Sequence, residues 1–491
     1  MYKPTLEEAK GISASGDYRC IPVCREILSD SRTPIEVMRA LQQVSQHCFI
    51  LESMDDSQRR GRYTVLGYEP TMELSCKDGR VTIKKKDAVE TYDGHPNEII
   101  RKVLQEHRSP SLPGLPKFTG GLVGYFSFDY VRYIEPTLIL DSNDDEDFKD
   151  VDLMLFDKVI VFDNLRLKTM VIVNVPVTDL DNGYPLAVKE IESMIDIILH
   201  GDTGGPRVGK LMSSFRSLFD EQQYSSMVEE VKNHIHEGDV FQAVISNRLE
   251  ADYEGSLLNM YRVIRTTNPS PYMFFISGCD VEIAGASPET LVRLEDGVLR
   301  TFPLAGTRPR GRTPEEDRMM EEELLSDEKE LAEHNMLVDL GRNDLGRVCR
   351  FNTIKVEEHL TVERFSHVMH LGSTVTGILD ERLDSIDALD AVLPAGTLSG
   401  APKVRACEII NRLENSKRGI YGGAIGYLGF NGNMDVCIAI RIAFKKNGKV
   451  FVQTGAGIVA DSVAEKEYQE CAGKARAILD AIETADGGDF L

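Results

Sequence analysis

The sequence predicts an α+β fold with a substantial antiparallel sheet. Short runs rich in β-branched residues alternate with longer segments of helical periodicity, and one pair of strand-like runs is joined by an Asn-Gly turn. Apolar residues make up 42% of the 491 residues and charged residues 27%, as in an ordinary folded globular protein. A chain of this length is enough for about two to four average domains, or for one large core with elaborations.

The strands are predicted from short apolar runs. Residues 170–177, MVIVNVPV, form one such run. Near the end of the chain, residues 439–444 (AIRIAF) and 449–455 (KVFVQTG) are joined by Lys445-Lys446-Asn447-Gly448. Because an Asn-Gly pair favours positive φ, these two runs are expected to form a β-hairpin.

A strong helix signal begins shortly after residue 220. Its apolar residues recur at helical spacing, and a glycine is placed to stop the helix. These residues are Tyr224, Met227, Val228, Val231 and Ile235, followed by Gly238.

Two segments interrupt the pattern of strands and helices. Residues 141–150, DSNDDEDFKD, are acidic and are expected to form a solvated loop. Residues 201–210, GDTGGPRVGK, are rich in glycine and lack periodicity, as in a linker. We therefore divide the chain into a smaller N-terminal part, 1–210, and a larger C-terminal part, 211–491.

Two predicted helices carry paired carboxylates. The first is expected to begin at Ser326, a good N-cap, and to continue through DEKELAEHNMLVDL. Its Glu330 and Glu333 are three residues apart and therefore project from one face.

The second helix is expected to begin at Ser462, with Glu465 completing a capping box. Glu467 and Glu470 repeat the three-residue spacing, and Lys474 follows Glu470 by one turn. If the two helix faces meet, four carboxylates converge, and a hard cation such as Mg²⁺ is needed to offset their repulsion. The alternative is that each pair is the solvated face of a surface helix, which spacing alone favours.

Three segments are rich in glycine, threonine and apolar residues, unlike plain surface loops: 303–308 (PLAGTR), 394–403 (PAGTLSGAPK) and 453–457 (QTGAG). Glycine lets the backbone approach a ligand, and exposed N–H groups with threonine hydroxyls can hold a carboxylate. Arg441 and Lys474 are candidate cationic partners for the same anion. Tight turns that need glycine only for their conformation remain the alternative for each segment.

Two further features indicate proton transfer. Glu289 lies in GASPET (285–290), at a break between apolar strands. His370 lies in ERFSHVMH (363–370), where His367 is an equally good candidate on the sequence alone.

Composition excludes some classes of function. The net charge is −23, from 56 Lys and Arg against 79 Asp and Glu, which argues against nucleic acid or an anionic membrane as partner. The N-terminus has no secretory signal pattern, and no apolar stretch approaches the ~18 residues of a spanning helix. The nine cysteines are scattered without zinc spacing, as in a reduced cytoplasmic protein.

Across roughly residues 220–485, these segments together resemble the chorismate-utilising enzymes in order and spacing. The N-terminal part also resembles the anthranilate synthase family, through FILESMDDSQRRGRYTVLGYEP (49–70) and GGLVGYFSFDYVRYIE (120–135). The resemblance implies a large mixed or antiparallel sheet core with flanking helices. It also implies a Mg²⁺-dependent lyase that aminates chorismate with ammonia and eliminates pyruvate to give anthranilate, the first step of tryptophan biosynthesis.

The resemblance implies a role for each motif residue. Glu333 and Glu470 would coordinate Mg²⁺, supported by Glu330 and Glu467. Glu289 would act as general acid for the departing ring hydroxyl, with His370 and Thr397 in the same pocket. The rest of the substrate site would be lined by Gly306, Thr307, Tyr421, Arg441, Gly455, Ala456, Gly457 and Lys474.

Two positions separate the close relatives. Aminodeoxychorismate synthases often carry lysine where this chain has Ala305, and that lysine can attack the substrate covalently. Isochorismate and salicylate synthases place a water-activating lysine where this chain has Gln242. Both residues favour ammonia as nucleophile and anthranilate as product. Component I of aminodeoxychorismate synthase stays the alternative enzyme, and an inactive tryptophan-binding sensor is the alternative from another class.

The resemblance also implies an effector site for L-tryptophan that inhibits the enzyme. Its residues come from both parts of the chain: Leu51, Glu52, Ser53, Asn268, Pro269, Pro271, Tyr272 and Met273. A packing seam between domains is the alternative explanation. No glutamine amidotransferase motif is present, so the resemblance implies a separate glutaminase subunit in a hetero-oligomer.

Overall fold

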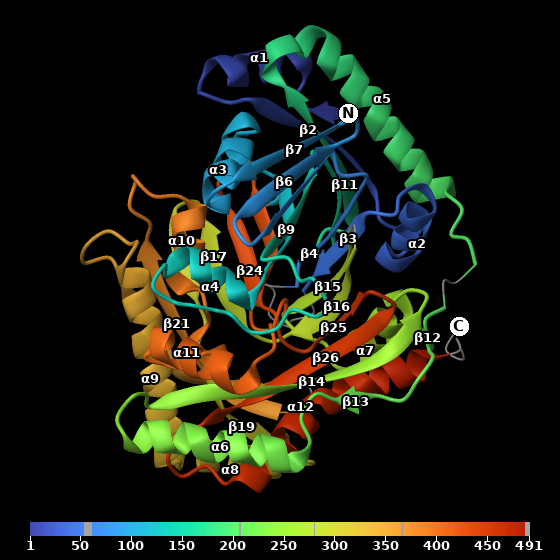
Figure 1. The fold of residues 1–491 in the computed structure, drawn as a ribbon. Coiled ribbons are helices and arrows are strands. Elements are labelled where there is room, and N and C mark those ends of the chain that lie inside the picture. Colours follow the sequence, from blue (N-terminus) through green and yellow to red (C-terminus); the bar gives the residue numbers. More distant parts are fainter. Residues whose placement is uncertain (54–60, 206–207, 279, 365–367, 487–491) are drawn as a thin grey trace.

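The computed structural model describes residues 1–53, 61–205, 208–278, 280–364 and 368–486. In these residues two antiparallel sheets of 14 and 12 strands pack face to face, and helices cover their outer faces (Figure 1). The expected α+β class with a large sheet core is therefore confirmed.

The first sheet joins the two ends of the chain. Its strands, in spatial order, are β1 (Tyr2–Lys3), β2 (Cys20–Leu28), β11 (Lys168–Pro176), β10 (Lys158–Asp163), β4 (Tyr63–Tyr68), β3 (Cys48–Glu52), β15 (Tyr272–Ser277), β16 (Glu282–Ser287), β25 (Ile442–Lys446), β26 (Lys449–Ile458), β14 (Gln242–Glu254) and β12 (Lys210–Leu211), with β13 (Arg216–Ser217) and β22 (Gly400–Ala401) also paired to β14.

The second sheet carries the middle of the chain. Its strands, in spatial order, are β19 (Leu304–Pro309), β21 (Val368–Ile378), β18 (Val298–Thr301), β17 (Thr290–Glu295), β24 (Met434–Ile438), β23 (Ala424–Gly429), β8 (Gly121–Phe126), β9 (Val151–Phe156), β5 (Met72–Lys77), β6 (Arg80–Lys85) and β7 (Ala88–Asp93), with β20 (Lys355–Arg364) also paired to β21.

The helices pack against both sheets and, in part, against one another. Their bounds are α1 (Leu6–Ala14), α2 (Pro34–Val44), α3 (Pro96–Glu106), α4 (Val131–Ile134), α5 (Leu180–His200), α6 (Glu221–His236), α7 (Leu258–Thr267), α8 (Pro314–Ser326), α9 (Glu328–Gly346), α10 (Ser385–Val392), α11 (Lys403–Glu414) and α12 (Ala464–Ala485), with short 3₁₀ turns η1 (Phe128–Tyr130), η2 (Val177–Asp179) and η3 (Gly396–Leu398).

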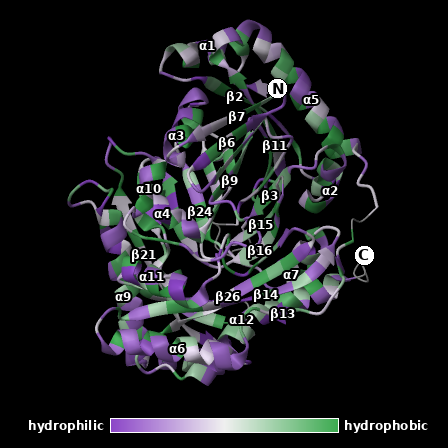
Figure 2. Ribbon diagram, in the orientation of Figure 1, coloured by the Kyte–Doolittle hydropathy of each residue, from purple (hydrophilic) through white to green (hydrophobic). Residues whose placement is uncertain are grey.

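The core lies in three layers. Between the sheets, aromatic and aliphatic side chains from both interlock, for example Phe49 of β3 edge-on against Phe156 of β9 with ring centroids 4.7 Å apart. Outside the first sheet lie α2, α5, α7 and α12, and outside the second lie α3, α9 and α10. Figure 2 shows the hydrophobic strands inside and hydrophilic residues on α6 at the bottom.

Both sheets contain strands from both parts of the chain. In the first sheet β3 pairs with β15, and in the second sheet β8 pairs with β23. The division into 1–210 and 211–491 stays a prediction, and in space the two parts share their sheets.

The strand predictions agree closely with the structure. The run 170–177 forms most of β11. The hairpin is β25 and β26, in which Asn447 and Gly448 form the two-residue turn with φ of 52° and 75°. The first strand begins at Ile442, however, so Arg441 precedes the hairpin.

The helix starts were predicted less well. α6 covers the predicted apolar run and Gly238 follows its end with φ 82°. Ser326, by contrast, ends α8, and Asp327 caps α9 through the N–H groups of Lys329 and Glu330. The capping box at Ser462 is also wrong, because the Ser462 hydroxyl accepts from the Val459 N–H and α12 starts at Ala464 with no side-chain cap.

The acidic run 141–150 is a loop as predicted, but it is only partly solvated. Glu146 and Asp150 are buried, and each binds a lysine from the C-terminal part, Lys449 at 2.7 Å and Lys417 at 2.8 Å. The run therefore ties the two parts together, because buried carboxylates need cationic partners.

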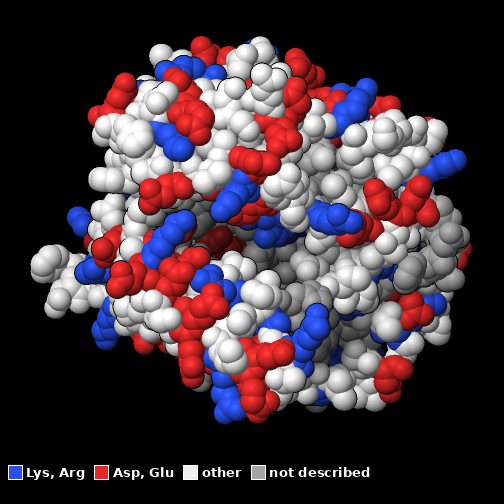
Figure 3. All heavy atoms as spheres, turned by 90° about the horizontal axis from the view of Figure 1, so that it is seen from below, with Lys and Arg blue, Asp and Glu red and all other residues white. Residues whose placement is uncertain are grey.

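In the described part of the chain, no helix is long and apolar enough to cross a membrane. The face seen from below in Figure 3 is hollowed near its centre, and acidic and basic side chains are interspersed around the hollow.

Candidate functional site

The candidate site lies at two neighbouring connections in which the chain passes from one sheet to the other. β16 of the first sheet leads into β17 of the second, and Glu289 lies in that crossing. β24 of the second sheet leads back into β25 of the first, and Arg441 lies there. Backbone hydrogen bonds join the crossings: the Ile438 N–H donates to the Glu289 carbonyl at 3.0 Å, and the Ala286 N–H donates to the Arg441 carbonyl at 3.1 Å. The two side chains are thus brought together by paired strands.

Glu289 has the electrostatic environment of a proton donor. The Thr397 hydroxyl, on η3, donates to its Oε1 at 3.2 Å. Burial raises the pKa of Glu289 to about 7, although Thr397, Arg441 and Lys474 pull it down. A carboxyl that is half protonated near neutral pH suits general acid catalysis.

Arg441 is a partly buried cation without a fixed partner. Its backbone has φ of 54°, in the left-handed region that residues other than glycine rarely adopt. Among the residues that the structure describes, its guanidinium makes no hydrogen bond or ion pair, while Tyr421, Glu470 and Glu289 act on it electrostatically. Burial lowers its pKa. Since a half-buried charge without a partner is costly, this position fits an anionic ligand.

Lys474 and Tyr421 border the same region. The Lys474 ammonium donates to the Gly455 carbonyl at 3.0 Å and pairs with Glu470 at 2.6 Å. A Cβ on Gly455 would lie 3.0 Å from the Tyr421 hydroxyl oxygen and 2.8 Å from the Ile245 carbonyl oxygen, so only glycine fits there. The structure therefore places Lys474, Gly455 and Tyr421 side by side.

The other residues of the 453–457 segment are packed against β14. Ala456 is fully buried, and a Cβ on Gly457 would collide with the Gln242 amide. Close packing therefore explains glycine at 457, and ligand binding by Ala456 and Gly457 stays a prediction.

His370 lies on β21 beside the glycine-rich segment of β19. Its Nδ1 is 2.7 Å from the Gly306 carbonyl oxygen and 3.2 Å from the Thr307 hydroxyl. Since a carbonyl only accepts, Nδ1 carries the proton and Nε2 the lone pair. Burial lowers the pKa of His370, which keeps the ring neutral. Its rival candidate, His367, lies outside the described residues.

The four predicted metal-binding carboxylates repel one another across α9 and α12. Burial raises the pKa of Glu333, and Glu330 and Glu470 raise it further. Burial also raises the pKa of Glu467, where Ser462 opposes and Glu470 adds to the effect. Carboxylates that destabilise one another's charged form fit a hard divalent cation.

No three of these four carboxylates, all of which the structure describes, lie within 4.8 Å of one another. Glu470 pairs with Lys474, and Glu330 lies 3.5 Å from an Arg308 nitrogen, so cations from the protein offset part of the charge. Gly306 also lies against Glu330: a Cβ there would be 3.3 Å from its Oε2. The glycine segment and the carboxylate helix therefore meet, as the interpretation of a shared site requires.

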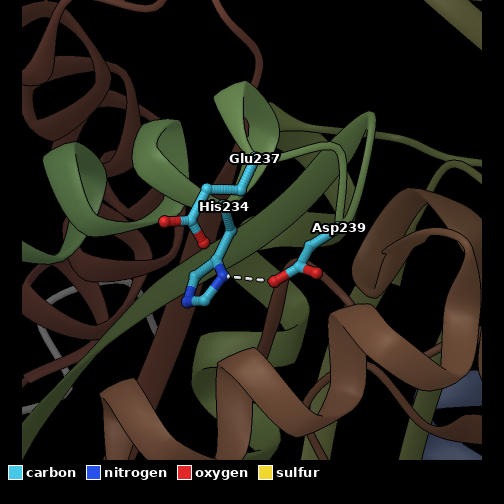
Figure 4. A group of neighbouring side chains, drawn as sticks. All are labelled: His234, Glu237 and Asp239. Carbon is cyan, nitrogen blue, oxygen red and sulfur yellow. Dashed lines mark hydrogen bonds and ion pairs between the residues drawn. The ribbon is translucent and has the colours of Figure 1, made fainter.

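A different group is gathered within 4.8 Å among the described residues: His234, Glu237 and Asp239 (Figure 4). His234 Nδ1 is 2.6 Å from Asp239, and Asp239 also binds Arg405 at 2.7 Å. Because arginine from α11 already pairs with the carboxylate, this group joins α6 to α11.

Six of the eight predicted effector residues line a large cavity of about 650 Å³. Leu51, Glu52 and Ser53, at the end of β3, line it together with Pro271, Tyr272 and Met273 of the neighbouring β15. Asn268 and Pro269 are not among its lining residues, since Asn268 ends α7.

Glu52 and Ser53, which both line this cavity, differ in whether their polar atoms have hydrogen-bond partners. The Glu52 carboxylate binds Tyr261 and Arg265 of α7, with an Arg265 nitrogen at 3.0 Å. The Ser53 hydroxyl oxygen is buried and has no hydrogen-bond partner among the described residues. An unsatisfied buried hydroxyl in a cavity is a position where a ligand can donate or accept.

Sequence reasoning missed the opposite wall of this cavity. That wall includes Thr290 and Arg293 of β17, Phe302, and Asp435 of β24. The alternation in 292–295 (VRLE) could have placed Arg293 and Glu295 on one face, but Phe302 and Asp435 carry no comparable local signal.

Known proteins match almost the whole chain. Residues 46–480 match the chorismate binding enzyme family. Anthranilate synthase component 1 of Acetivibrio thermocellus is 44% identical over 99% of both chains, and that of Pseudomonas aeruginosa is 43% identical over 98% of this chain and 99% of its own.

Solved structures agree. Anthranilate synthase component I from Streptococcus pneumoniae superposes with a TM-score of 0.78 at 36% identity, covering 92% of this chain and 98% of its own. The isochorismate synthase MenF of Escherichia coli, at 20% identity and a TM-score of 0.69 over 97% and 98%, shares the fold. The chain therefore belongs to the chorismate binding enzyme family and, within it, to the group formed by component 1 of anthranilate synthase.

Proposed function

We propose that the protein converts chorismate and ammonia to anthranilate, pyruvate and water. The observation that carries this proposal is the pair of neighbouring strand connections that hold Glu289 and Arg441. There, a carboxyl with a pKa of about 7 lies close to a guanidinium that makes no hydrogen bond or ion pair with the described residues. A dianionic substrate that loses a hydroxyl group needs both: a cation to bind it and an acid to protonate the leaving oxygen.

The chain's own side chains divide the work. Arg441 and Lys474 bind substrate carboxylate, and Gly306, Thr307, Tyr421 and Gly455 surround the ring. Ammonia forms the C–N bond at C2 while the C4–O bond breaks, and Glu289 gives its proton to the departing hydroxyl, which leaves as water. Thr397 holds the Glu289 carboxyl in place through its 3.2 Å hydrogen bond.

The second half of the reaction makes the ring aromatic. C2 loses its proton and the enolpyruvyl C–O bond breaks, so that pyruvate forms once a proton is returned. His370, neutral with its lone pair on Nε2, is the candidate base beside Gly306.

We propose Mg²⁺ as the cofactor, held by Glu333 and Glu470 with support from Glu330 and Glu467. The raised pKa values of Glu333 and Glu467 support this choice, because they mark carboxylates that need a cation. When bound, the ion would offset the charge of a substrate carboxylate.

Two residues favour anthranilate over the products of related enzymes. Ala305 is buried in β19 opposite Leu371 and offers no nucleophile to the ring. The Gln242 amide packs against Gly457 and cannot serve as a base for water. Ammonia is therefore the proposed nucleophile.

We further propose that L-tryptophan binds in the 650 Å³ cavity and inhibits the enzyme. The buried Ser53 hydroxyl without a partner and the mixed polar and apolar lining support an amphipathic ligand. A separate glutaminase subunit supplies ammonia in a cytoplasmic hetero-oligomer.

The test is turnover of the purified chain with chorismate, Mg²⁺ and ammonium at mildly alkaline pH, with products identified by mass. Anthranilate and pyruvate, lost with EDTA and restored by excess Mg²⁺, are expected. If 4-amino-4-deoxychorismate accumulates, the alternative aminodeoxychorismate synthase is correct. Tryptophan binding without any turnover would identify a sensor.

A further inference from the structure

The large cavity shares a wall with the region around Glu289, Thr397 and Arg441, which we call the catalytic corner. A second, small cavity of about 50 Å³ lies against Glu289 and Thr397. Thr290 and Phe302 line both cavities. The residue that follows the candidate acid is therefore part of the partition between the two sites.

A hydrogen-bonded chain runs along this wall. The Tyr272 hydroxyl lies 2.7 Å from Asp435 Oδ1 and 2.9 Å from the Thr290 hydroxyl. Because an ionised carboxylate only accepts, Tyr272 donates to Asp435 and accepts from Thr290. Tyr272 belongs to β15 in the first sheet, whereas Thr290 and Asp435 belong to the second, so these hydrogen bonds connect the two sheets.

The backbone at Thr290 is irregular. The register of β17 against β24 shifts between Thr290 and Val292, which marks a bulge next to Glu289. Bulges leave a residue outside the regular ladder and re-aim neighbouring side chains. Among the described residues, the Glu289 carboxyl makes one side-chain hydrogen bond, from Thr397. Thr290 therefore adjoins the candidate acid at an irregular point of β17.

We propose that Thr290 is a positioning residue, which orients Glu289 through its hydrogen bond to Tyr272 and transmits occupancy of the large cavity to the acid. A ligand that engages Tyr272 or Asp435 pulls on Thr290 and turns Glu289 away from Thr397. This inference rests on the proposed function and adds the route by which its inhibitor acts.

The experiment compares Thr290→Val with Thr290→Ser and the wild-type chain. Valine keeps the shape and removes the hydroxyl, whereas serine keeps the hydroxyl. Thr301→Val is the matched control, because Thr301 lines the small cavity and is not among the lining residues of the large one. Anthranilate formation is measured at saturating L-tryptophan, and KM and kcat are measured without it.

Binding is measured separately from inhibition. The chain contains no tryptophan, so fluorescence of bound L-tryptophan excited near 295 nm is read almost free of protein signal. For Thr290→Val we expect the Kd of tryptophan to stay within about threefold of wild type, while inhibition at saturation falls from about tenfold or more to below about threefold. We also expect kcat to fall with KM for chorismate little changed. Thr290→Ser restores wild-type kcat and inhibition, and Thr301→Val keeps the full inhibition.

Equal inhibition at saturation in Thr290→Val and wild type overturns the inference while the proposed function stands. If the wild-type chain makes no anthranilate, the proposed function fails, and the inference falls with it. If Thr290→Val does not fold, Tyr272→Phe breaks the same link from the other side. Full inhibition of Tyr272→Phe at saturating tryptophan then counts against the inference.

Discussion

The large cavity is lined by strands that pair with one another, whereas the carboxylates of α9 and α12 stand on two helices far apart in sequence. At the cavity, Glu52 and Met273 are direct partners in the register of β3 and β15. Backbone hydrogen bonds therefore hold the cavity open without a ligand. At the helices, Glu330 and Glu470 raise the pKa of Glu333, and protein cations pair with Glu330 and Glu470.

The difference indicates which site requires a bound ligand to bring its residues together. A cavity between paired strands is preformed, so its ligand binds with little reorganisation. Carboxylates on separate helices are gathered only by a cation that offsets their repulsion. The region of Glu289 and Arg441 lies between the two extremes: backbone hydrogen bonds hold both residues, but the guanidinium makes no hydrogen bond or ion pair with the described residues.

The strongest test of this contrast is removal of one of the proposed metal-binding carboxylates. We expect Glu333→Gln to lower anthranilate formation by about 10²–10³-fold, because the charge that holds the cation is lost. Glu328→Gln, on an exposed position of the same helix, is the control. The measurement is turnover as a function of Mg²⁺ concentration. Unchanged Mg²⁺ dependence in Glu333→Gln would remove it from the metal site.

Loss of the cation at the corner is expected to have the next largest effect. Arg441→Met should raise KM for chorismate by about 10- to 150-fold, the range for a hydrogen bond to a charged group. Arg476→Met, on the exposed face of α12, serves for comparison. Steady-state kinetics at saturating Mg²⁺ separates KM from kcat, and a normal KM in Arg441→Met contradicts substrate binding by this guanidinium.

The ionisation of Glu289 is expected to make the free energy of unfolding depend on pH. Its folded-state pKa of about 7 lies above its ordinary value of 4.5, so the native state holds more protons than the unfolded state between these values. The free energy of unfolding therefore falls as pH rises through this window. Without substrate, Glu289→Gln is expected to be about 1–3 kcal/mol more stable than wild type at pH 8 and not at pH 4.5. Denaturant unfolding at both pH values measures this, and equal stability at pH 8 refutes the raised pKa.

The smallest effect is expected at the preformed cavity. Ser53→Phe fills space beside the hydroxyl that lacks a partner and should raise the tryptophan concentration for half-inhibition by about tenfold or more. Inhibition curves for both variants measure this concentration. Ser53→Ala is the comparison, because alanine removes the hydroxyl without filling the cavity. An unaltered curve for the phenylalanine variant would move the effector site elsewhere.

Local patterns predicted some parts of the fold well. The turn at Asn447-Gly448 was predictable because both residues tolerate positive φ. The α6 helix was predictable because five apolar residues repeat at its period. The caps at Ser326 and Ser462 were wrong, because Asp327 is a competing acceptor one residue later and the Ser462 hydroxyl is used by Val459.

The sequence by itself determined the class of fold, the helices with paired carboxylates and, through its motifs, the family. Only the tertiary structure decided that Glu289 and Arg441 lie at adjacent crossings, that the acidic loop binds Lys417 and Lys449, and that Thr290 separates two cavities. Periodicity and turn chemistry act over a few residues, whereas these contacts join strands of different sheets. The order of strands that are far apart in the sequence sets such contacts, and that order leaves no signal in the local periodicity.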